Sequence, residues 1–253
     1  MAIGDLLERT ESETLDFKEI FHSNNACFVH DFICLANSNH STEKYLIFGV
    51  REKDGIIEEI IGIDNDSNKK NFQQITNILQ SSFFNRLPRF SYKEYLINEL
   101  TVGVLEIKPS SLKPFYLLKD KIEGKTRVRA GVMYTRLGDT NTPIDSCPND
   151  SELEQMWKSR FHLDKSPSER LEILLNNPEE WKAGYGQGMV SVLHHDQYPE
   201  FTMTINSGSD EQIDGGCESW MEGFPDPSLY SSYIYLSYSS TTLKCIIKCQ
   251  LPT

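Results

Sequence analysis

A carboxylate and an ammonium that could do chemistry lie close together in the stretch Glu11-Ser12-Glu13-Thr14-Leu15-Asp16-Phe17-Lys18. Apolar Leu15 and Phe17 alternate with Asp16 and Lys18, a period of two that is typical of a half-buried strand. On such a strand Asp16 and Lys18 share the solvent-facing side. The pair is either a surface ion pair of small energetic value or part of a site that handles a phosphate or a metal.

The spacing of Glu11 and Asp16 restricts how their carboxylates can meet. Five positions place them on opposite faces of a straight strand, and well over a quarter turn apart on a helix. They can converge only if Glu11 lies on the turn that enters the strand or at the end of a preceding helix. Carboxylates that do converge suit Mg²⁺ or Mn²⁺, which can stabilise charge and activate an oxygen in phosphodiester cleavage.

A local basic strip lies within an acidic chain. The 253 residues carry a net charge of -12, of which residues 162–253 carry -8, whereas residues 108–136 carry +6. Judged by charge alone, the basic strip is a solvent-exposed hairpin. The alternative is that it contacts nucleic acid. The strip residues that could follow a phosphate backbone are Lys113, Arg127, Arg129 and Arg136. Three aromatic residues lie among these cations in the sequence and could stack on bases: Phe115, Tyr116 and Tyr134. Such residues lie in a protein core more often than they stack on bases.

Periodicity predicts an α+β protein with one domain over residues 1–160, a boundary near 160–166, and a smaller, mostly β domain over 161–253. The predicted helices cover 3–9, 24–37, 67–83, 151–161 and 168–175. The predicted strands cover 11–18, 45–50, 56–63, 88–97, 99–108, 115–118, 126–130, 132–136, 189–195, 201–205, 230–238 and 243–250. The sequence ends just after a strand-like run, which leaves an incomplete C-terminal domain open.

Several other patterns give weaker signals. Cys27, His30 and Cys34 share a helix face, but their apolar neighbours favour small buried residues over a zinc site. His194 and His195 lack a nucleophile partner, so we expect a surface pair at a strand end. No apolar run is long enough to span a membrane, and the acidic N-terminus does not have the pattern of a signal peptide. We therefore expect a cytoplasmic protein.

Five patches in order give a more specific signal. They are Glu11-Ser12-x-x-x-Asp16-Phe17-Lys18, Leu35-Ala36-Asn37-Ser38, Leu46-Ile47-Phe48-Gly49-Val50, Leu105-Glu106-Ile107-Lys108-Pro109-Ser110-x-x-Lys113-Pro114 and Tyr134-Thr135-Arg136-Leu137-Gly138. Together they resemble the Schlafen-type AlbA-like domain, which is also described as a divergent AAA ATP-binding domain. The resemblance covers a little over half of the chain and implies a mixed sheet with packed helices.

The resemblance also implies a function. Members of this family are described as nucleic-acid-binding modules, and some are metal-dependent endoribonucleases that cut transfer or ribosomal RNA at a site of three acidic residues. The matching positions are Glu11, Asp16 and Glu52, with Lys18 beside them as a candidate contact to the scissile phosphate. The family commonly has a Gly-Gly pair before the Gly-Val strand, whereas this chain has the longer, glycine-free segment 38–44.

Three hypotheses follow. The first is an endoribonuclease with Mg²⁺ or Mn²⁺ on Glu11, Asp16 and Glu52 that acts in bacterial defence. The second is a non-catalytic module that binds DNA or RNA, and the third is an ATP-binding protein. The third has only a partial P-loop match, Gly124-Lys125-Thr126, which lacks the earlier glycine and the following helix. The expected partner is RNA or DNA and not a membrane, and a homodimer stays open.

Overall fold

The computed structural model describes residues 3–53, 56–184, 190–206 and 230–250, with the side chains of all but 230–232 and 247–250. The chain divides into two compact units, Met1–Phe161 and His162–Thr253. This division falls inside the interval 160–166 in which the sequence predicts a boundary. The α+β class is confirmed, since helices and strands are segregated around a mixed sheet in the first unit and an antiparallel sheet in the second.

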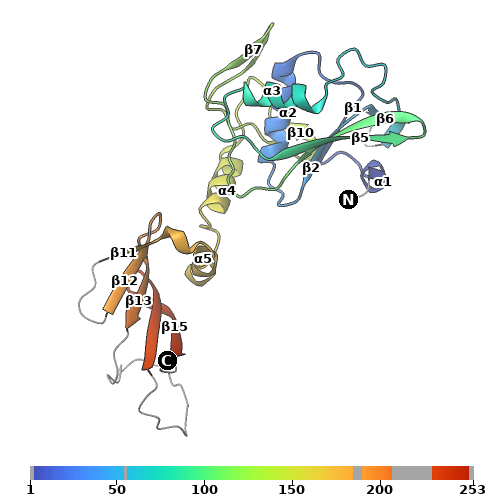
Figure 1. Ribbon diagram of the computed structural model, residues 1–253. Coiled ribbons are helices and arrows are strands. Elements are labelled where there is room, and N and C mark those ends of the chain that lie inside the picture. The colour runs from blue at the N-terminus through green and yellow to red at the C-terminus, as the bar shows by residue number, and fades with distance from the viewer. Residues whose placement is uncertain (1–2, 54–55, 185–189, 207–229, 251–253) are drawn as a thin grey trace. The chain divides into compact units, whose positions relative to one another are not determined.

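The first unit is built on a four-stranded mixed sheet. Its strands lie in the order β1 (Leu15–Lys18), β2 (Lys44–Phe48), β6 (Leu100–Ile107) and β5 (Phe90–Ile97). β1 runs parallel to β2, whereas the other two pairs are antiparallel. Parallel neighbours need a long crossover, which α2 (Asn25–Asn37) supplies between β1 and β2. Figure 1 shows α2 lying across this sheet.

Both faces of the sheet are covered. The apolar side chains of α2 pack with Leu46 and Phe48 in one core cluster. On the other face, Leu6 of α1 (Ile3–Leu7) packs with Leu15 and Phe17 in a second cluster. The residues of β2 are buried in both directions, which is why that strand reads as a continuous apolar run and not as an alternating one.

This two-sided burial corrects the interpretation of β1. Asp16 lies opposite Leu46 in the register of β1 and β2, so its side chain points to the face that α2 covers. It is only 1% exposed. The prediction of a solvent-facing Asp16 is therefore wrong, because the second face of the strand is an interior face and not a wet one.

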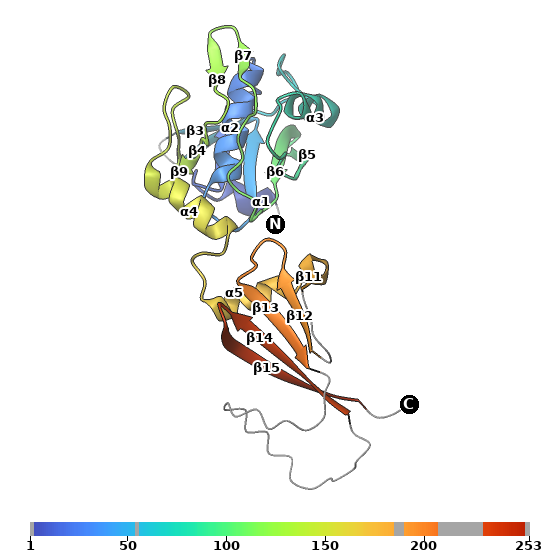
Figure 2. The ribbon, with the colours of Figure 1, turned by 90° about the vertical axis from the view of Figure 1, so that its left-hand side faces the viewer.

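Three hairpins and two helices surround the sheet. The hairpins are β3 (Val50–Lys53) with β4 (Ile56–Ile60), β7 (Lys121–Glu123) with β8 (Thr126–Val128), and β9 (Arg136–Leu137) with β10 (Thr140–Asn141). The helices are α3 (Phe72–Gln80) and α4 (Asp150–Arg160). Figure 2 shows the β7–β8 hairpin beside one end of α2.

Some predicted boundaries are wrong for local reasons. β1 begins at Leu15 and not at residue 11, because residues 13–14 form a turn. α3 begins at Phe72 and not at 67, because Asn71 and Gln74 form a reciprocal capping box there. Segment 115–118 forms a single bridge through Leu117 instead of a strand, and of 132–136 only Arg136 joins one.

Asn37, at the end of α2, joins three parts of the first unit. Its side-chain Nδ2 donates to the backbone oxygens of Phe115, at 2.8 Å, and Tyr134, at 2.7 Å. Its Oδ1 accepts from the backbone N–H of Phe115 at 2.7 Å. The side chain is fully buried. These bonds satisfy backbone groups of Phe115 and Tyr134, which lie outside the strands and have no strand partner for these groups.

The described part of the second unit is an antiparallel sheet packed with a helix, α5 (Pro167–Leu174). Trp181 and Phe201 of the sheet form a small core with Leu171 and Leu174 of α5 and Leu236. The strands, in spatial order, are β11 (Trp181–Ala183), β12 (Val190–His195), β13 (Phe201–Asn206), β14 (Tyr230–Tyr238) and β15 (Thr241–Gln250), and a 3₁₀ turn covers Pro178–Glu180. Across the described parts of both units, no helix is long and apolar enough to cross a membrane.

The buried Asn37 generates a stability prediction. Asn37→Ala leaves three buried backbone groups without partners, so we expect the free energy of unfolding to fall by about 3–5 kcal/mol in urea titrations. Asn39→Ala is the matched control, because Asn39 is exposed and makes one side-chain bond to Gln155. We expect a change below about 0.5 kcal/mol there. Equal, small losses in both variants would contradict the assigned role of Asn37.

Candidate functional site

Glu11 reaches the sheet from a bend. It precedes a turn at residues 13–14 that is closed by the backbone bond from Ser12 N–H to Leu15 O, at 3.0 Å. Its Oε1 then accepts from the backbone N–H of Phe17 at 2.8 Å. This is the geometry that the five-residue spacing requires if Glu11 and Asp16 are to converge.

Arg136 lies between the two carboxylates. Its Nη2 is 3.3 Å from Asp16 Oδ1 and 3.6 Å from Glu11 Oε2. Its other nitrogens donate to Ser12 O at 2.8 Å and to Asn141 Oδ1 at 2.9 Å. At 3% exposure the guanidinium cannot reach a phosphate backbone in this structure. The prediction that Arg136 contacts nucleic acid is therefore corrected: it binds the acids of its own chain.

Lys18 connects this pair to a third carboxylate. Its Nζ lies 2.8 Å from Asp16 Oδ2 and 3.5 Å from Asp31 Oδ2. Asp31, on α2, also faces His22 Nε2 at 2.8 Å and His30 Nδ1 at 3.5 Å. We call Glu11, Asp16, Lys18, Asp31 and Arg136 the acid–base cluster. Lys18 keeps 29% of its side chain exposed, so the cluster has one edge at the surface.

The electrostatics of the acid–base cluster are uneven. Burial, with a smaller contribution from the Asp16 charge, raises the pKa of Glu11 to about 7, although the Phe17 N–H acts against this. Burial acts to raise the pKa of Asp31 too, but hydrogen bonds from His22 and His30 and the charge of Lys18 hold it well below its usual range. Near neutral pH the cluster therefore exchanges a proton at Glu11.

The third predicted carboxylate lies on another element. Glu52 is in β3, paired with Ile57 of β4, in the hairpin that is separate from the four-stranded sheet. Over the described ranges, no three His, Cys, Asp or Glu side chains form a group that could hold a metal ion. Asp16 and Glu11 face cations instead, so the donor set as arranged does not fit Mg²⁺ or Mn²⁺. A metal on Glu11, Asp16 and Glu52 stays a prediction.

The remaining strip residues have different environments. Arg127 is exposed and pairs with Asp120, with Nε at 2.8 Å from Oδ2. Arg129 is half-buried and donates to Ser146 O at 3.0 Å. Lys113 turns inward and donates to the backbone oxygens of Ser38 and His40. Of the three aromatics, Phe115 and Tyr134 are buried in the core and cannot stack on bases.

The patterns with weaker signals have structural explanations. Cys34 is buried with its Sγ 3.6 Å from His30 Nε2, and Cys27 lies near Thr126. His195 is fully buried and faces Glu180 at 3.0 Å, so the expectation of a surface pair is wrong for it. Gly124-Lys125-Thr126 spans the tip of the β7–β8 hairpin, with a strand and not a helix after it.

Sequence reasoning missed Asp31, His22 and Asn141. Asp31 is the single Asp or Glu in α2, a helix whose other side chains are mostly apolar. A lone carboxylate among buried apolar residues is a signal of a paired interior charge. His22 and Asn141 carry no comparable signal, because their role depends on tertiary contacts with Asp31, which in the case of Asn141 is 110 positions away.

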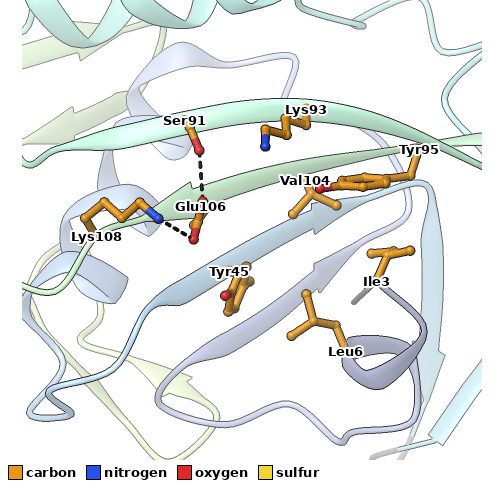
Figure 3. A pocket seen from close by; sticks show the side chains of 9 residues that line it. All are labelled: Ile3, Leu6, Tyr45, Ser91, Lys93, Tyr95, Val104, Glu106 and Lys108. Carbon is orange, nitrogen blue, oxygen red and sulfur yellow. Dashed lines mark hydrogen bonds and ion pairs between the residues drawn. The ribbon is translucent and has the colours of Figure 1, made fainter. Parts of the chain in front are cut away.

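A separate hollow of about 260 Å³ lies on the α1 face of the sheet. Its Glu106 accepts from Ser91 Oγ at 3.0 Å and from Lys108 Nζ at 2.7 Å, as Figure 3 shows. The side chains that line it are Ile3, Leu6, Tyr45, Ser91, Lys93, Tyr95, Val104, Glu106 and Lys108. Because the Glu106 carboxylate is already paired with Lys108, this hollow adds no free carboxylate to the acid–base cluster.

Comparison with known proteins identifies the first unit. The family model described as Schlafen, AlbA_2 matches residues 11–145, more than half of the chain, which confirms the predicted resemblance. No curated protein matches. A solution NMR structure, the N-terminal domain of a protein from Nitrosomonas europaea described as related to the ATP-dependent DNA helicase RecG, is similar at 16% identity. Its TM-score is 0.37, over 59% of this chain and 95% of that one.

The raised pKa of Glu11 generates a pH prediction. The folded protein holds a proton on Glu11 up to about pH 7, whereas the unfolded chain releases it near 4.5. The stability that this proton contributes is present below pH 4.5 and is lost as the pH rises through 7. Glu11→Gln keeps an acceptor for Phe17 N–H and removes the titration. We therefore expect the variant to gain stability, relative to the wild type, on the order of 2 kcal/mol between pH 4.5 and 8.

Urea titrations at a series of pH values measure this difference. Glu8→Gln, at an exposed position after α1, is the matched control, and its pH profile should parallel that of the wild type. A Glu11→Gln profile that also parallels the wild type would show that Glu11 does not hold a proton in the folded state.

Proposed function

The chain belongs to the Schlafen AlbA_2 family, and on that premise we propose that its first unit binds nucleic acid through the β7–β8 hairpin and its flanks. We call residues 119–129 the basic hairpin. Membership of this family suggests a nucleic-acid-related function, and the chemistry of the basic hairpin supports binding as its form. The observation that carries the proposal is an exposed aromatic ring, Phe83, beneath the amine of Lys119.

Phe83 is 54% exposed, and Lys119 Nζ lies 4.5 Å from the centre of its ring. Phe83 is joined to the start of the hairpin by the bond from Leu118 N–H to Phe83 O, at 2.7 Å. An exposed ring beside cations is what a single-stranded nucleic acid uses, since bases stack on the ring and phosphates contact the amines. The cations of the basic hairpin are Lys119, Lys121, Lys125, Arg127 and Arg129.

Of the two acids in the basic hairpin, Asp120 pairs with Arg127, and Glu123 contacts α2. Glu123 accepts from the backbone N–H of Asn25 at 2.7 Å, at the N-terminus of α2. The side chain of Asn24 donates back to Glu123 O at 2.9 Å. The positive end of the helix dipole stabilises this carboxylate. The hairpin is thereby held against α2, and the charge of Glu123 is directed away from an approaching polyanion.

A metal-dependent endoribonuclease is the second candidate. The convergence of Glu11 and Asp16 beside the partly exposed Lys18 favours it. Against it, each carboxylate already faces a cation, and Arg136 is too buried to leave without a large cost. We therefore propose that the acid–base cluster stabilises the fold and that binding is separate from it.

The binding proposal predicts a charge-specific loss. We expect Lys119→Ala/Arg127→Ala to weaken binding of single-stranded RNA or DNA about ten-fold near 100 mM salt, with the slope of log K against log salt reduced by about 2. Fluorescence anisotropy over a salt series measures both quantities. Lys53→Ala/Lys158→Ala removes two exposed cations outside the hairpin and is the matched control.

Phe83→Ala separates stacking from charge. We expect it to weaken binding of single strands by about 1–3 kcal/mol and to leave the salt slope unchanged. Phe72→Ala, at a ring that is 50% exposed on α3, is its control. If the wild type, Lys119→Ala/Arg127→Ala and Lys53→Ala/Lys158→Ala bind single strands with equal affinity, the basic hairpin is not the binding site.

The nuclease alternative has its own test. The full chain is incubated with transfer RNA and Mn²⁺ beside Glu11→Gln and Asp16→Asn, after thermal unfolding has shown that the variants fold. Our proposal predicts that no cleavage depends on either residue. Metal-dependent cleavage that both substitutions abolish would establish the endoribonuclease and replace the binding module as the function of this unit.

A further inference from the structure

Two lysine amines lie side by side in the first unit without a carboxylate partner. Lys44 Nζ donates to His40 O at 2.8 Å and to Thr42 O at 3.3 Å. Lys113 Nζ donates to Ser38 O and, at 3.3 Å, to the same His40 O. The two nitrogens thus share the backbone oxygen of His40. Within the described part of the chain, neither amine forms an ion pair with a carboxylate.

This arrangement is unusual for buried cations. Lys44 is 1% exposed, and charged side chains at that depth are normally paired with an opposite charge. Here the partners are backbone carbonyl groups, which carry only dipoles. Each ammonium has three N–H donors and uses two on these oxygens. Each of the two amines thus has a spare donor, and neither has a carboxylate within ion-pair distance in the described part of the chain.

Lys113 opens on a pocket of about 280 Å³ whose lining suits an oxyanion. Side chains with hydroxyl and amide groups line the pocket together with Lys113, and no acidic side chain is among the described residues that line it. Ser110 Oγ accepts from Leu112 N–H at 3.1 Å, so its hydroxyl hydrogen stays available. The polar lining residues are Asn39, His40, Ser41, Ser110, Ser111, Lys113 and Ser159.

We propose that this pocket binds a phosphate group, held by the Lys113 amine and the serine hydroxyls around it, with Lys44 adding positive charge from behind. The phosphate comes either from a free phosphate monoester or from the backbone of a nucleic acid. The site does not depend on the basic hairpin, since its lining comes from residues 39–41, 109–113 and Ser159 and not from residues 119–129.

The lysine pair couples this binding to pH. Burial and the neighbouring Lys44 lower the pKa of Lys113 to about 7, and burial lowers that of Lys44 to about 8. The acids that act on them are Glu13 for Lys113 and Glu43 for Lys44, both attractive, and His40 lies 3.4 Å from Glu13. At pH 8 the free Lys113 amine is mostly neutral. A bound oxyanion raises its pKa, so binding takes up a proton.

Calorimetry of the full chain tests the proposal. Sulfate is the first probe, because its own protonation does not change near pH 8, and inorganic phosphate is the second. We expect both anions to bind. The measured heat of binding should depend on the ionisation enthalpy of the buffer, because the buffer supplies the proton that Lys113 takes up. Affinity should fall as the pH rises from 7 to 9. An exposed lysine would bind weakly without taking up a proton at pH 8.

Three variants make the assignment specific. Lys113→Met should weaken sulfate binding at least ten-fold and remove the proton uptake, whereas Ser110→Ala/Ser111→Ala weakens binding and keeps the uptake. Lys108→Met is the matched control, since Lys108 is an exposed lysine paired with Glu106 outside this pocket. Absence of binding at millimolar sulfate and phosphate, or equal binding in Lys113→Met and wild type, would overturn the proposal.

Competition with sulfate distinguishes the two sources of phosphate. Displacement by a nucleoside 5′-monophosphate, but not by an oligonucleotide without terminal phosphates, assigns the pocket to a monoester. Displacement by that oligonucleotide assigns it to a backbone phosphate. The Lys119→Ala/Arg127→Ala variant should bind sulfate as the wild type does, so failure of the hairpin proposal and failure of this one are separate results.

Discussion

The buried Arg136 guanidinium is the interaction on which the first unit depends most. Its nitrogens contact Asp16 and Glu11, and also Ser12 and Asn141, so that one side chain joins the start of the sheet to the β9–β10 hairpin. A buried ion pair of this kind is weak evidence for stability as such, but loss of one partner leaves an uncompensated charge. The approach of Glu11 and Asp16 to each other therefore depends on this cation, whereas Lys18 connects Asp16 to Asp31.

The sequence predicts the elements better than it predicts their surroundings. Alternation correctly identifies a strand at Leu15 and Phe17, and the five-residue spacing correctly requires Glu11 to approach from a bend. Alternation cannot tell whether the second face of a strand meets water or a helix, which is why the burial of Asp16 was not foreseen. From the sequence, Arg136 is interpreted as one cation of a basic strip, because its partner Asp16 lies 120 positions earlier in the chain.

The basic strip divides by environment and not by charge. Arg136 is an interior residue, Lys113 turns onto backbone oxygens beside a pocket, and Arg127 stays exposed on the hairpin. The net charge of residues 108–136 counts each of these three residues as one positive charge, whatever its environment. Their difference arises from tertiary contacts: the hairpin is fixed at the N-terminus of α2 by Glu123, whereas the Lys113 segment is fixed at the C-terminus of the same helix by Asn37.

The long sequence separation between Arg136 and its acids has a consequence for the order of folding. Asp16 and Arg136 are 120 positions apart, so the carboxylates leave the ribosome long before the guanidinium that neutralises them. Contacts of such separation form late, after the cost of closing the intervening chain has been met. Until β9 docks, the nascent sheet carries a repelling pair of acids beside Lys18. The first unit therefore completes its interior only when almost all of its own sequence is available, and a chain cut short before residue 136 cannot close it.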